Sequence, residues 1–328
     1  MIIQNLLPKV YADSLNTLIL SAEFPWYWRS ENMIGKHSIC PLFQLTHPIY
    51  THNKSVTPYY KTIFPIVTFL NKKTNIKIKS IVRIKANLIP KIVTNEEWDK
   101  TAIHQDVEIN KNCISVIYYV HDCDGDTFVY ADDKETIIDS STPKENSCYI
   151  LNSKTWHRSS VPVENKRRVV INFVFEVEST DIKLVDYDNS LDNKLDTFLE
   201  SIGTKNMPHR NERLYDHLMR TYFLVKDTFK DDTIALIGGL HSVYGTTAYK
   251  NKCLPYESTL IKDTFGDKVN KYVRMFGSIN RQLLEEPDGS INDEDLYILR
   301  CVEVANLYDQ QSLDKRPNLL AFAKQRKI

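Results

Sequence analysis

The chain has 328 residues, of which 42% are hydrophobic and 26% charged; this composition is ordinary for a soluble globular protein, and the length favours two domains. Basic and acidic residues number 42 each, so the formal net charge of zero carries no signature of binding to nucleic acid or to an anionic membrane. No apolar run approaches membrane-spanning length and the N-terminus lacks the pattern of a signal peptide, so we expect a soluble, cytoplasmic protein.

The cysteines are scattered and include no CxxC pair. This pattern favours free thiols in a reducing compartment over a disulfide framework or a zinc site. The six residues are Cys40, Cys113, Cys123, Cys148, Cys253 and Cys301.

The first quarter of the chain predicts a short strand, two helices and paired strands. Within residues 1–30, apolar residues at helical spacing predict a helix that starts at Asp13 and Ser14. Residues 58–73 predict a second helix, which Pro65 should kink or break. Apolar and polar residues alternate over 76–79 and 81–88, as in half-buried strands.

No acidic residue lies between Glu31 and Glu96, although this span is rich in lysine. Two interpretations stay open. The lysines could cover a solvated face of strands and turns, or they could form a basic rim that favours an anionic substrate.

Residues 113–177 predict a series of short strands about ten residues apart, which is typical of a barrel or jelly roll. The segment 121–126 has turn chemistry, with Gly125 able to take a positive φ. The strands are predicted at 113–120, 127–130, 135–138, 147–151 and 168–177.

Beyond an acidic, polar linker at 181–190, the hydrophobic period becomes helical. Residues 314–328 are basic, and we expect them to fray. Helices are predicted at 191–202, 214–225, 234–240, 269–276 and 295–308. The chain is therefore expected to be a multidomain α+β protein, with a β-rich domain at 1–180 and an all-α domain at 191–328.

Two histidines and a carboxylate in the β-rich region suit a non-haem Fe(II) site. His104 and Asp106 are two residues apart on an extended segment, so their side chains share one face, and His157 follows after enough chain for strands to return beside them. Three ligands of these types leave coordination positions open for a cosubstrate and O₂. The alternative is a surface His-Asp pair with an unrelated distal histidine.

A basic residue after His157 could anchor the far carboxylate of a 2-oxo acid. In the strand 168–177, Arg168 and Asn172 share a face, whereas Arg167 points to the other side, so we favour Arg168 as the anchor and Asn172 as a further cofactor-binding residue. An arginine buried on that face implies a bound anion. Tyr119 could donate its hydroxyl to the same carboxylate, or it could only pack in the barrel.

Residues 76–177 resemble the 2-oxoglutarate/Fe(II)-dependent oxygenase superfamily, and within it the prolyl-hydroxylase-like branch. The matching motifs are His104-Gln105-Asp106, the strand at 113–119, the segment 125–128 where the family often has Gly-Gly-Thr, His157, and residues 168–173. Asp126 departs from the usual glycine, which leaves the subgroup open.

The resemblance implies a double-stranded β-helix with Fe(II) on His104, Asp106 and His157. It also implies that 2-oxoglutarate is held by Arg168 with help from Tyr119. The expected reaction is O₂-dependent hydroxylation with release of succinate and CO₂. Because related halogenases lack the carboxylate ligand, Asp106 favours hydroxylation or desaturation.

The helical region contains His209, His217 and His241, the last at the end of an apolar segment. Over about residues 191–310 the chain resembles the HD-domain superfamily, which implies a second metal site on these histidines. Ser242 stands where that signature has aspartate, so Glu303 or Asp309 could contribute instead. The alternative is a helical partner module with core histidines.

Three functions therefore stay open. The chain could be a hydroxylase with a helical accessory domain, or a non-redox metal-binding barrel that serves a phosphohydrolase or second oxygenase in the helical domain. The two domains could also act in sequence on one molecule. We expect a small-molecule or peptidyl substrate, anionic if the basic rim binds it, while the sequence specifies neither its identity nor the oligomeric state.

Overall fold

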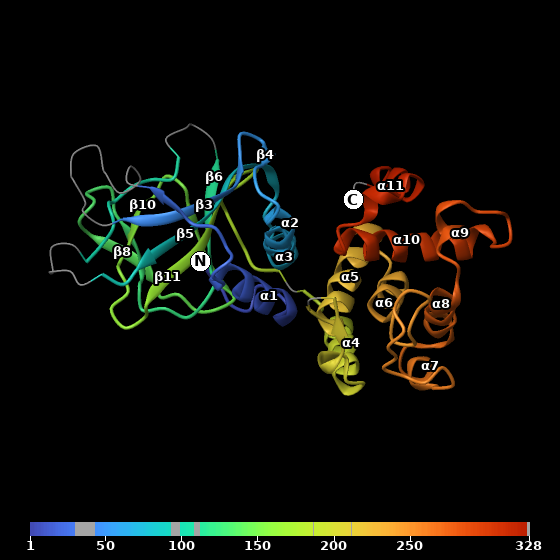
Figure 1. Ribbon diagram of the computed structural model, residues 1–328. Helices are drawn as coiled ribbons and strands as arrows, with labels where there is room; N and C mark the ends of the chain where they lie inside the picture. Colours follow the sequence, from blue (N-terminus) through green and yellow to red (C-terminus); the bar gives the residue numbers. More distant parts are fainter. Residues whose placement is uncertain (30–42, 93–98, 108–111, 186, 211, 327–328) are drawn as a thin grey trace. The chain divides into compact units, whose positions relative to one another are not determined.

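The structure is a computed structural model that describes residues 1–328 except 30–42, 93–98, 108–111, 186, 211 and 327–328. It divides into two compact units, Met1–Tyr187 and Asp188–Ile328 (Figure 1). The first unit is α+β and the second is helical apart from one short hairpin. No helix among the described residues is long and apolar enough to span a membrane.

The first unit is built on a large antiparallel sheet in the order β1-β9-β6-β11-β5-β3-β2, with β4 paired to β3. A smaller antiparallel sheet has the order β10-β7-β8. Two antiparallel sheets of this kind are consistent with a jelly-roll core. The strands of the large sheet are β1 (Ile2–Ile3), β2 (Tyr27–Arg29), β3 (Gln44–Thr51), β4 (Lys54–Ser55), β5 (Ile78–Pro90), β6 (Cys113–Tyr119), β9 (Ser147–Asn152) and β11 (Arg167–Val177). Those of the smaller sheet are β7 (Thr127–Tyr130), β8 (Ile137–Ser141) and β10 (Trp156–Ser159).

The helices of the first unit are α1 (Lys9–Leu20), α2 (Tyr60–Ile63) and α3 (Pro65–Lys73), which lie together beside the strands (Figure 1). The predicted break at Pro65 is confirmed, because α3 starts with that proline in the position where its missing N–H is harmless. The predicted start of the first helix is wrong. It begins at Lys9 directly after Pro8, and Asp13 lies inside it, paired with Lys9 at 2.9 Å.

The strand predictions for residues 113–177 are confirmed to within a few residues at each end. The segments predicted at 76–79 and 81–88 form one strand, β5, which pairs along its length with β11. β6 pairs with the other edge of β11, so β11 is a central strand with nearly all of its residues buried.

In the second unit α5 packs on α6, and α10 packs against both. The expectation that residues 314–328 fray is wrong for 317–324, which form a helix whose Leu319 and Ala323 are buried against Val304 and Leu313. The elements are α4 (Ser190–Ser201), η3 (Thr204–Asn206), β12 (Pro208–His209), β13 (Glu212–Arg213), α5 (Leu214–Phe229), α6 (Asp232–Leu240), α7 (Leu260–Phe265), α8 (Asp267–Ser278), α9 (Gln282–Glu285), α10 (Asp293–Asp309), η4 (Leu313–Lys315) and α11 (Pro317–Lys324).

All five cysteines in the described part of the chain are free thiols, as predicted. The sixth, Cys40, lies outside the described residues.

Candidate metal and cofactor site

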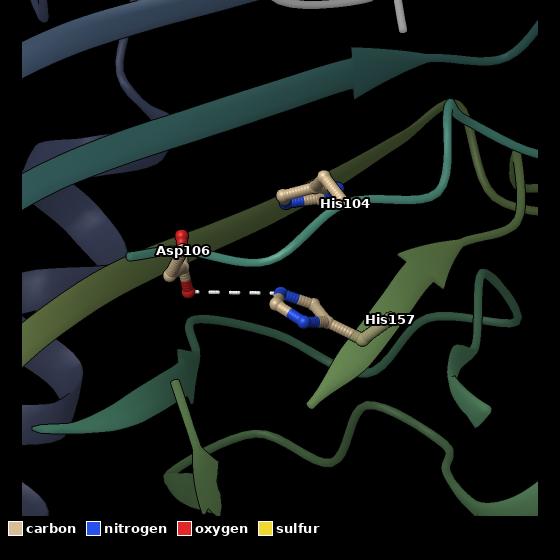
Figure 2. A group of neighbouring side chains, drawn as sticks. All are labelled: His104, Asp106 and His157. Carbon is tan, nitrogen blue, oxygen red and sulfur yellow. Dashed lines mark ion pairs between the residues drawn. The ribbon is translucent and has the colours of Figure 1, made fainter. Parts of the chain in front are cut away.

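His104, Asp106 and His157 come together beside β10, and one donor atom from each lies within 4.8 Å of the others (Figure 2). The backbones of His104 and His157 exchange two N–H···O hydrogen bonds of 3.0 Å, which set the two rings side by side with centroids 4.5 Å apart. Asp106 is held by its own backbone N–H, which donates to the Ser153 carbonyl at 3.0 Å. The Asp106 Oδ2 atom lies 3.6 Å from His157 Nε2.

Backbone hydrogen bonds fix the same tautomer in both histidines. Nδ1 of His104 lies 3.0 Å from the Ala102 carbonyl oxygen, and Nδ1 of His157 lies 2.9 Å from that of Thr155. Because a carbonyl oxygen only accepts, each Nδ1 carries a proton, and in a neutral ring Nε2 then offers a lone pair. His104 is an exposed residue whose ring packs against that of His157, and loss of hydration together with this neighbour lowers its pKa to about 4. Neutral rings oriented through Nδ1 are the arrangement that metal-binding histidines use.

Three side chains hold the Asp106 carboxylate. Arg83 donates to Oδ1 at 2.5 Å, Ser115 donates its hydroxyl to Oδ2 at 2.6 Å, and the Asn172 amide donates to Oδ2 at 3.3 Å. Burial alone would raise the pKa of Asp106, but His157 and His104 in their protonated forms, the Arg83 guanidinium and the Ser115 hydroxyl hold it well below its usual range. The carboxylate is therefore ionised and oriented.

The register of the large sheet explains why these residues meet. Directly opposed residues in an antiparallel sheet share a face. Val174 on β11 lies opposite both Arg83 on β5 and Ser115 on β6. Two residues earlier, Asn172 lies opposite Lys85 and Ile117. One face of the sheet thus carries the residues around Asp106 and, further along β11, Arg168.

Arg168 is 4% exposed and forms no ion pair with a carboxylate among the described residues. Its Nε donates to the Gly125 carbonyl at 2.7 Å, and one terminal nitrogen donates to the Thr127 hydroxyl at 2.8 Å. Burial lowers its pKa from the ordinary value, yet an arginine stays charged in proteins. A buried guanidinium bonded only to neutral groups retains strong attraction for an anion.

The neighbouring arginine is placed differently. Arg167 donates to the Leu20 carbonyl at 2.9 Å, beside helix α1, and is partly exposed. The alternation along β11 therefore separates the two arginines as predicted, although it does not by itself identify a ligand.

Tyr119 interacts with Arg168 through its ring, whose centroid lies 6.0 Å from the guanidinium carbon, and through Thr127. Its hydroxyl lies 3.0 Å from the Thr127 hydroxyl, which also accepts from Arg168, and its ring belongs to a buried cluster with Ile117 and Val170. The position of Tyr119 is therefore compatible both with donation of its hydroxyl to a 2-oxo acid carboxylate and with packing alone.

Gly125 serves close packing rather than a left-handed turn. Gly125 does not use the positive φ that glycine permits, because it is not among the left-handed residues of the structure. Instead, a Cβ at this position would lie 2.9 Å from Arg168 Cδ and 3.1 Å from the Ser160 carbonyl oxygen. Only glycine lets the guanidinium reach the Gly125 carbonyl without a clash.

Several buried polar atoms on this face have no hydrogen-bond partner among the described residues. They are Arg83 Nε, Asn87 Oδ1 and Asn172 Oδ1, and all three residues project from β5 or β11. An unpaired buried polar group costs about 1–3 kcal/mol, so each calls for a partner such as water or a ligand. These atoms, with the uncompensated charge of Arg168, fit a polar, anionic molecule bound next to the histidines.

Arg83, Ser115 and Thr127 contact the candidate site residues but were not predicted from the sequence. Arg83 and Ser115 carry no motif, and only the strand register places them against Asp106. Thr127 belongs to the motif at 125–128, but its contact with Arg168 depends on the fold.

In the second unit the structure also brings together the three histidines singled out above. The rings of His209 and His217 stack with centroids 4.2 Å apart, and Nε2 of His217 lies 3.3 Å from Nε2 of His241. Asp309 contacts His217 at 2.8 Å, whereas Glu303 pairs with Arg281.

Residues 198–281 match the model of a family described as a domain of unknown function, DUF6817. This segment contains His209, His217 and His241 but not Asp309. No curated protein matches the chain. The HD resemblance of the second unit therefore stays a prediction.

Solved structures that resemble this chain include prolyl hydroxylases and 2-oxoglutarate/Fe(II) oxygenases, over about half of its length. A prolyl-4-hydroxylase from Pseudomonas putida is 12% identical with a TM-score of 0.36, covering 54% of this chain and 91% of that one. A Trichoplax adhaerens prolyl hydroxylase, in complex with a hypoxia inducible factor peptide fragment, is 14% identical with a TM-score of 0.37, covering 54% and 83%. A 2OG-Fe(II) oxygenase family protein from Burkholderia pseudomallei is 14% identical with a TM-score of 0.37, covering 50% and 76%. Likeness at this level assigns no reaction, so the assignment of function rests on the side chains described above.

Proposed function

We propose that the first unit is an Fe(II)- and 2-oxoglutarate-dependent dioxygenase that hydroxylates its substrate with release of succinate and CO₂. The observation that carries the proposal is the pair of histidines whose Nε2 lone pairs meet an ionised, oriented carboxylate. Two imidazoles and a carboxylate with open positions are the ligand set of non-haem Fe(II) oxygenases. When bound, Fe(II) and 2-oxoglutarate would activate O₂ for attack on a C–H bond.

In this proposal, different residues of the chain bind the metal and the 2-oxoglutarate. His104, Asp106 and His157 hold the metal, and the backbone carbonyls behind the two histidines keep both rings in the liganding tautomer. Arg168 takes the far carboxylate of 2-oxoglutarate, while Thr127 and Tyr119 keep the guanidinium aimed at it. Burial of Arg168 strengthens this contact, because water does not compete for the charge.

Asn172 lies on β11 between Arg168 and the residues that surround Asp106. Its amide nitrogen faces Asp106, and its unpartnered Oδ1 is free to accept from a water molecule or from substrate. We therefore assign it to the same pocket as Arg168, as a neighbour of both the metal and the 2-oxo acid.

The test is anaerobic addition of Fe(II) and 2-oxoglutarate to the purified full-length protein. We expect a weak visible charge-transfer band and, on admission of air, slow succinate formation even without substrate. His104→Ala should abolish both signals, because one of the metal ligands is lost. Metal binding without a band or succinate would favour the alternative, a non-redox metal-binding barrel.

We also propose that the substrate carries negative charge. Lys85 lies opposite Asn172 in the register of β5 and β11. Burial and His157 are the main causes of the lowered pKa of His104, and the charge of Lys85 contributes to it as well. Lys85 therefore lies on the face of the sheet that carries the candidate metal site. A lysine on the face of the sheet that carries the candidate metal site would attract a substrate anion.

A panel of anionic and neutral small molecules and peptides would check this. Anionic members should stimulate succinate formation, and Lys85→Met should weaken that stimulation about tenfold, the size of one charge-assisted contact. Stimulation by neutral compounds alone, unchanged in Lys85→Met, would contradict an anionic substrate.

A further inference from the structure

Ser141 on β8 has a buried hydroxyl without a hydrogen-bond partner in the part of the chain that the structure describes. The residue is 2% exposed, and its Oγ is one of the buried polar atoms that stay unpaired. Buried hydroxyls are nearly always paired, because only a new hydrogen bond offsets the loss of their hydration. The Ser141 hydroxyl therefore calls for a bound molecule as its partner.

The strand register places Ser141 on the face of the small sheet that carries His157. Ser141 lies opposite Thr127 on β7, and Thr127 lies opposite Ser159 on β10. Ser159 is two residues from His157, and alternate residues of a strand share a face. Ser141 is thus on the same side of its sheet as a candidate metal ligand.

The groups around Ser141 are those of the candidate 2-oxoglutarate pocket. Thr127 accepts a hydrogen bond of 2.8 Å from Arg168, and its Oγ1 lies 3.0 Å from the Tyr119 hydroxyl. The same Tyr119 hydroxyl lies 3.5 Å from the Ser141 carbonyl oxygen. Ser141 is therefore connected to Arg168 through Tyr119 and through its own strand partner Thr127.

These groups together offer an excess of hydrogen-bond donors. A guanidinium carries more N–H groups than the two that Arg168 donates to the Gly125 carbonyl and the Thr127 hydroxyl. Ser141 adds an O–H that has no acceptor among the described residues. An ionised carboxylate only accepts, whereas an amide would turn N–H donors of its own toward these groups. A carboxylate is thus the chemical group that fits here.

We propose that the Ser141 hydroxyl donates a hydrogen bond to the far carboxylate of 2-oxoglutarate, beside Arg168, and so helps to select dicarboxylic 2-oxo acids. This inference rests on the proposed function, and it adds a residue of β8, a strand outside the motifs that carry the family resemblance. A hydrogen bond to an ionised acceptor is stronger than one between neutral groups. The hydroxyl is unpaired without the cosubstrate and becomes paired when it binds.

Ser141→Ala tests the proposal in the full-length protein loaded with Mn²⁺, by calorimetric titration. The Kd for 2-oxoglutarate should rise about tenfold or more, because a hydrogen bond to a charged group is lost. The Kd for 2-oxobutyrate, which lacks the far carboxylate, should not change. Without any ligand the thermal midpoint should not fall, because the variant loses a hydroxyl that has no partner.

Ser140→Ala is the matched control. Ser140 is adjacent and exposed, and it lies opposite Phe128 on the other face of β8, so its loss should leave both Kd values unchanged. Ser141→Cys replaces the hydroxyl by a weaker donor of similar shape, and its Kd for 2-oxoglutarate should be intermediate. If Ser141→Ala binds 2-oxoglutarate normally, weakens both acids by the same factor, or lowers the ligand-free midpoint, the assignment is wrong.

Glutarate distinguishes a failure of this inference from a failure of the proposed function, because it keeps the far carboxylate and lacks the 2-oxo group. If 2-oxoglutarate binding depends on His104 but not on Ser141, the proposed function stands and this inference fails. If glutarate binding depends on Arg168 and Ser141, and 2-oxoglutarate gains nothing from the metal, the carboxylate pocket stands and the proposed function fails. If the unmodified protein binds neither acid, both are wrong.

Discussion

Arg168→Ala should raise the Kd for 2-oxoglutarate by at least about 30-fold, because losing one partner of a buried charge pair costs about 2–5 kcal/mol. The guanidinium is 4% exposed and donates to the Gly125 carbonyl and the Thr127 hydroxyl, which are both neutral, so its charge would attract the proposed cosubstrate. Calorimetric titration of Mn²⁺-loaded protein with 2-oxoglutarate would measure the loss. The Kd of Arg168→Lys for 2-oxoglutarate should lie between those of the unmodified protein and of Arg168→Ala, because lysine keeps the charge but lacks the planar fork of donors.

Arg167→Ala is the matched control, since it removes the adjacent arginine on the other face of β11. Arg167 donates to the Leu20 carbonyl beside α1, so its loss should leave 2-oxoglutarate affinity unchanged. If Arg167→Ala weakens binding and Arg168→Ala does not, the two assignments are reversed.

Thermal stability separates a binding role of Arg168 from a structural one. Without 2-oxoglutarate, Arg168→Ala should cost little, because the variant loses two hydrogen bonds to neutral groups and is relieved of a buried charge. With excess 2-oxoglutarate the unmodified protein should gain stability by mass action, and the variant should not. A large fall in stability without the cosubstrate would instead mark Arg168 as a structural residue.

Gly125→Ala provides an independent perturbation of the same contact. The new methyl would stand 2.9 Å from Arg168 Cδ and 3.1 Å from a backbone oxygen, so the arginine has to move. Weaker 2-oxoglutarate binding with full metal binding is expected.

Local patterns were sufficient to place residues whose position depends on one segment. His104 and Asp106 share a face of one extended stretch, and Arg168 follows from alternation within one strand. Pro65 breaks its helix for a reason internal to its own ring. The start of α1 differs from the prediction because the helix begins directly after Pro8, and Asp13 lies inside it.

Contacts between segments were beyond the reach of the sequence. Arg83 and Ser115 meet Asp106 because both lie opposite Val174 in the sheet register, and nothing in their own neighbourhoods marks that pairing. His217 and His241 were recognised as candidates, but their 3.3 Å contact depends on how α5 packs on α6. The helix at 317–324 could not be predicted from its own segment. The apolar partners of Leu319 lie outside that segment, in an earlier helix and in the preceding 3-10 helix.

Removing the Asp106 carboxylate should abolish metal binding in the first unit and also destabilise the protein. Asp106→Ala takes away one of the three proposed ligands and leaves Arg83, Ser115 and Asn172 without their shared acceptor. The Asp106 side chain is 3% exposed and that of Arg83 33%, so the ion pair is only partly screened by water. We expect a loss of about 1–3 kcal/mol in the free energy of unfolding of the metal-free protein.

Arg83→Met separates orientation from ligation. Arg83 donates to Oδ1, and Oδ2 is the oxygen that lies 3.6 Å from His157 Nε2, so Arg83 directs the carboxylate to offer one oxygen to the metal. Its loss should weaken Fe(II) binding by about 10–100-fold without abolishing it, as for other residues behind metal ligands. Lys77→Met removes an exposed charge from the same strand region and should change neither metal affinity nor stability.

The double variant Asp106→Ala/Arg83→Met separates two effects of the Asp106 carboxylate, which are binding the metal and pairing with Arg83. If the instability of Asp106→Ala comes from an arginine left without its acceptor, the double variant should regain most of the lost stability, because no charge is then unpaired. It should still bind no metal, since the ligand is absent. If Asp106→Ala binds one equivalent of Fe(II) with unchanged affinity, Asp106 is not a ligand. If the losses in the free energy of unfolding add up in the double variant, Arg83 stabilises the fold by other contacts.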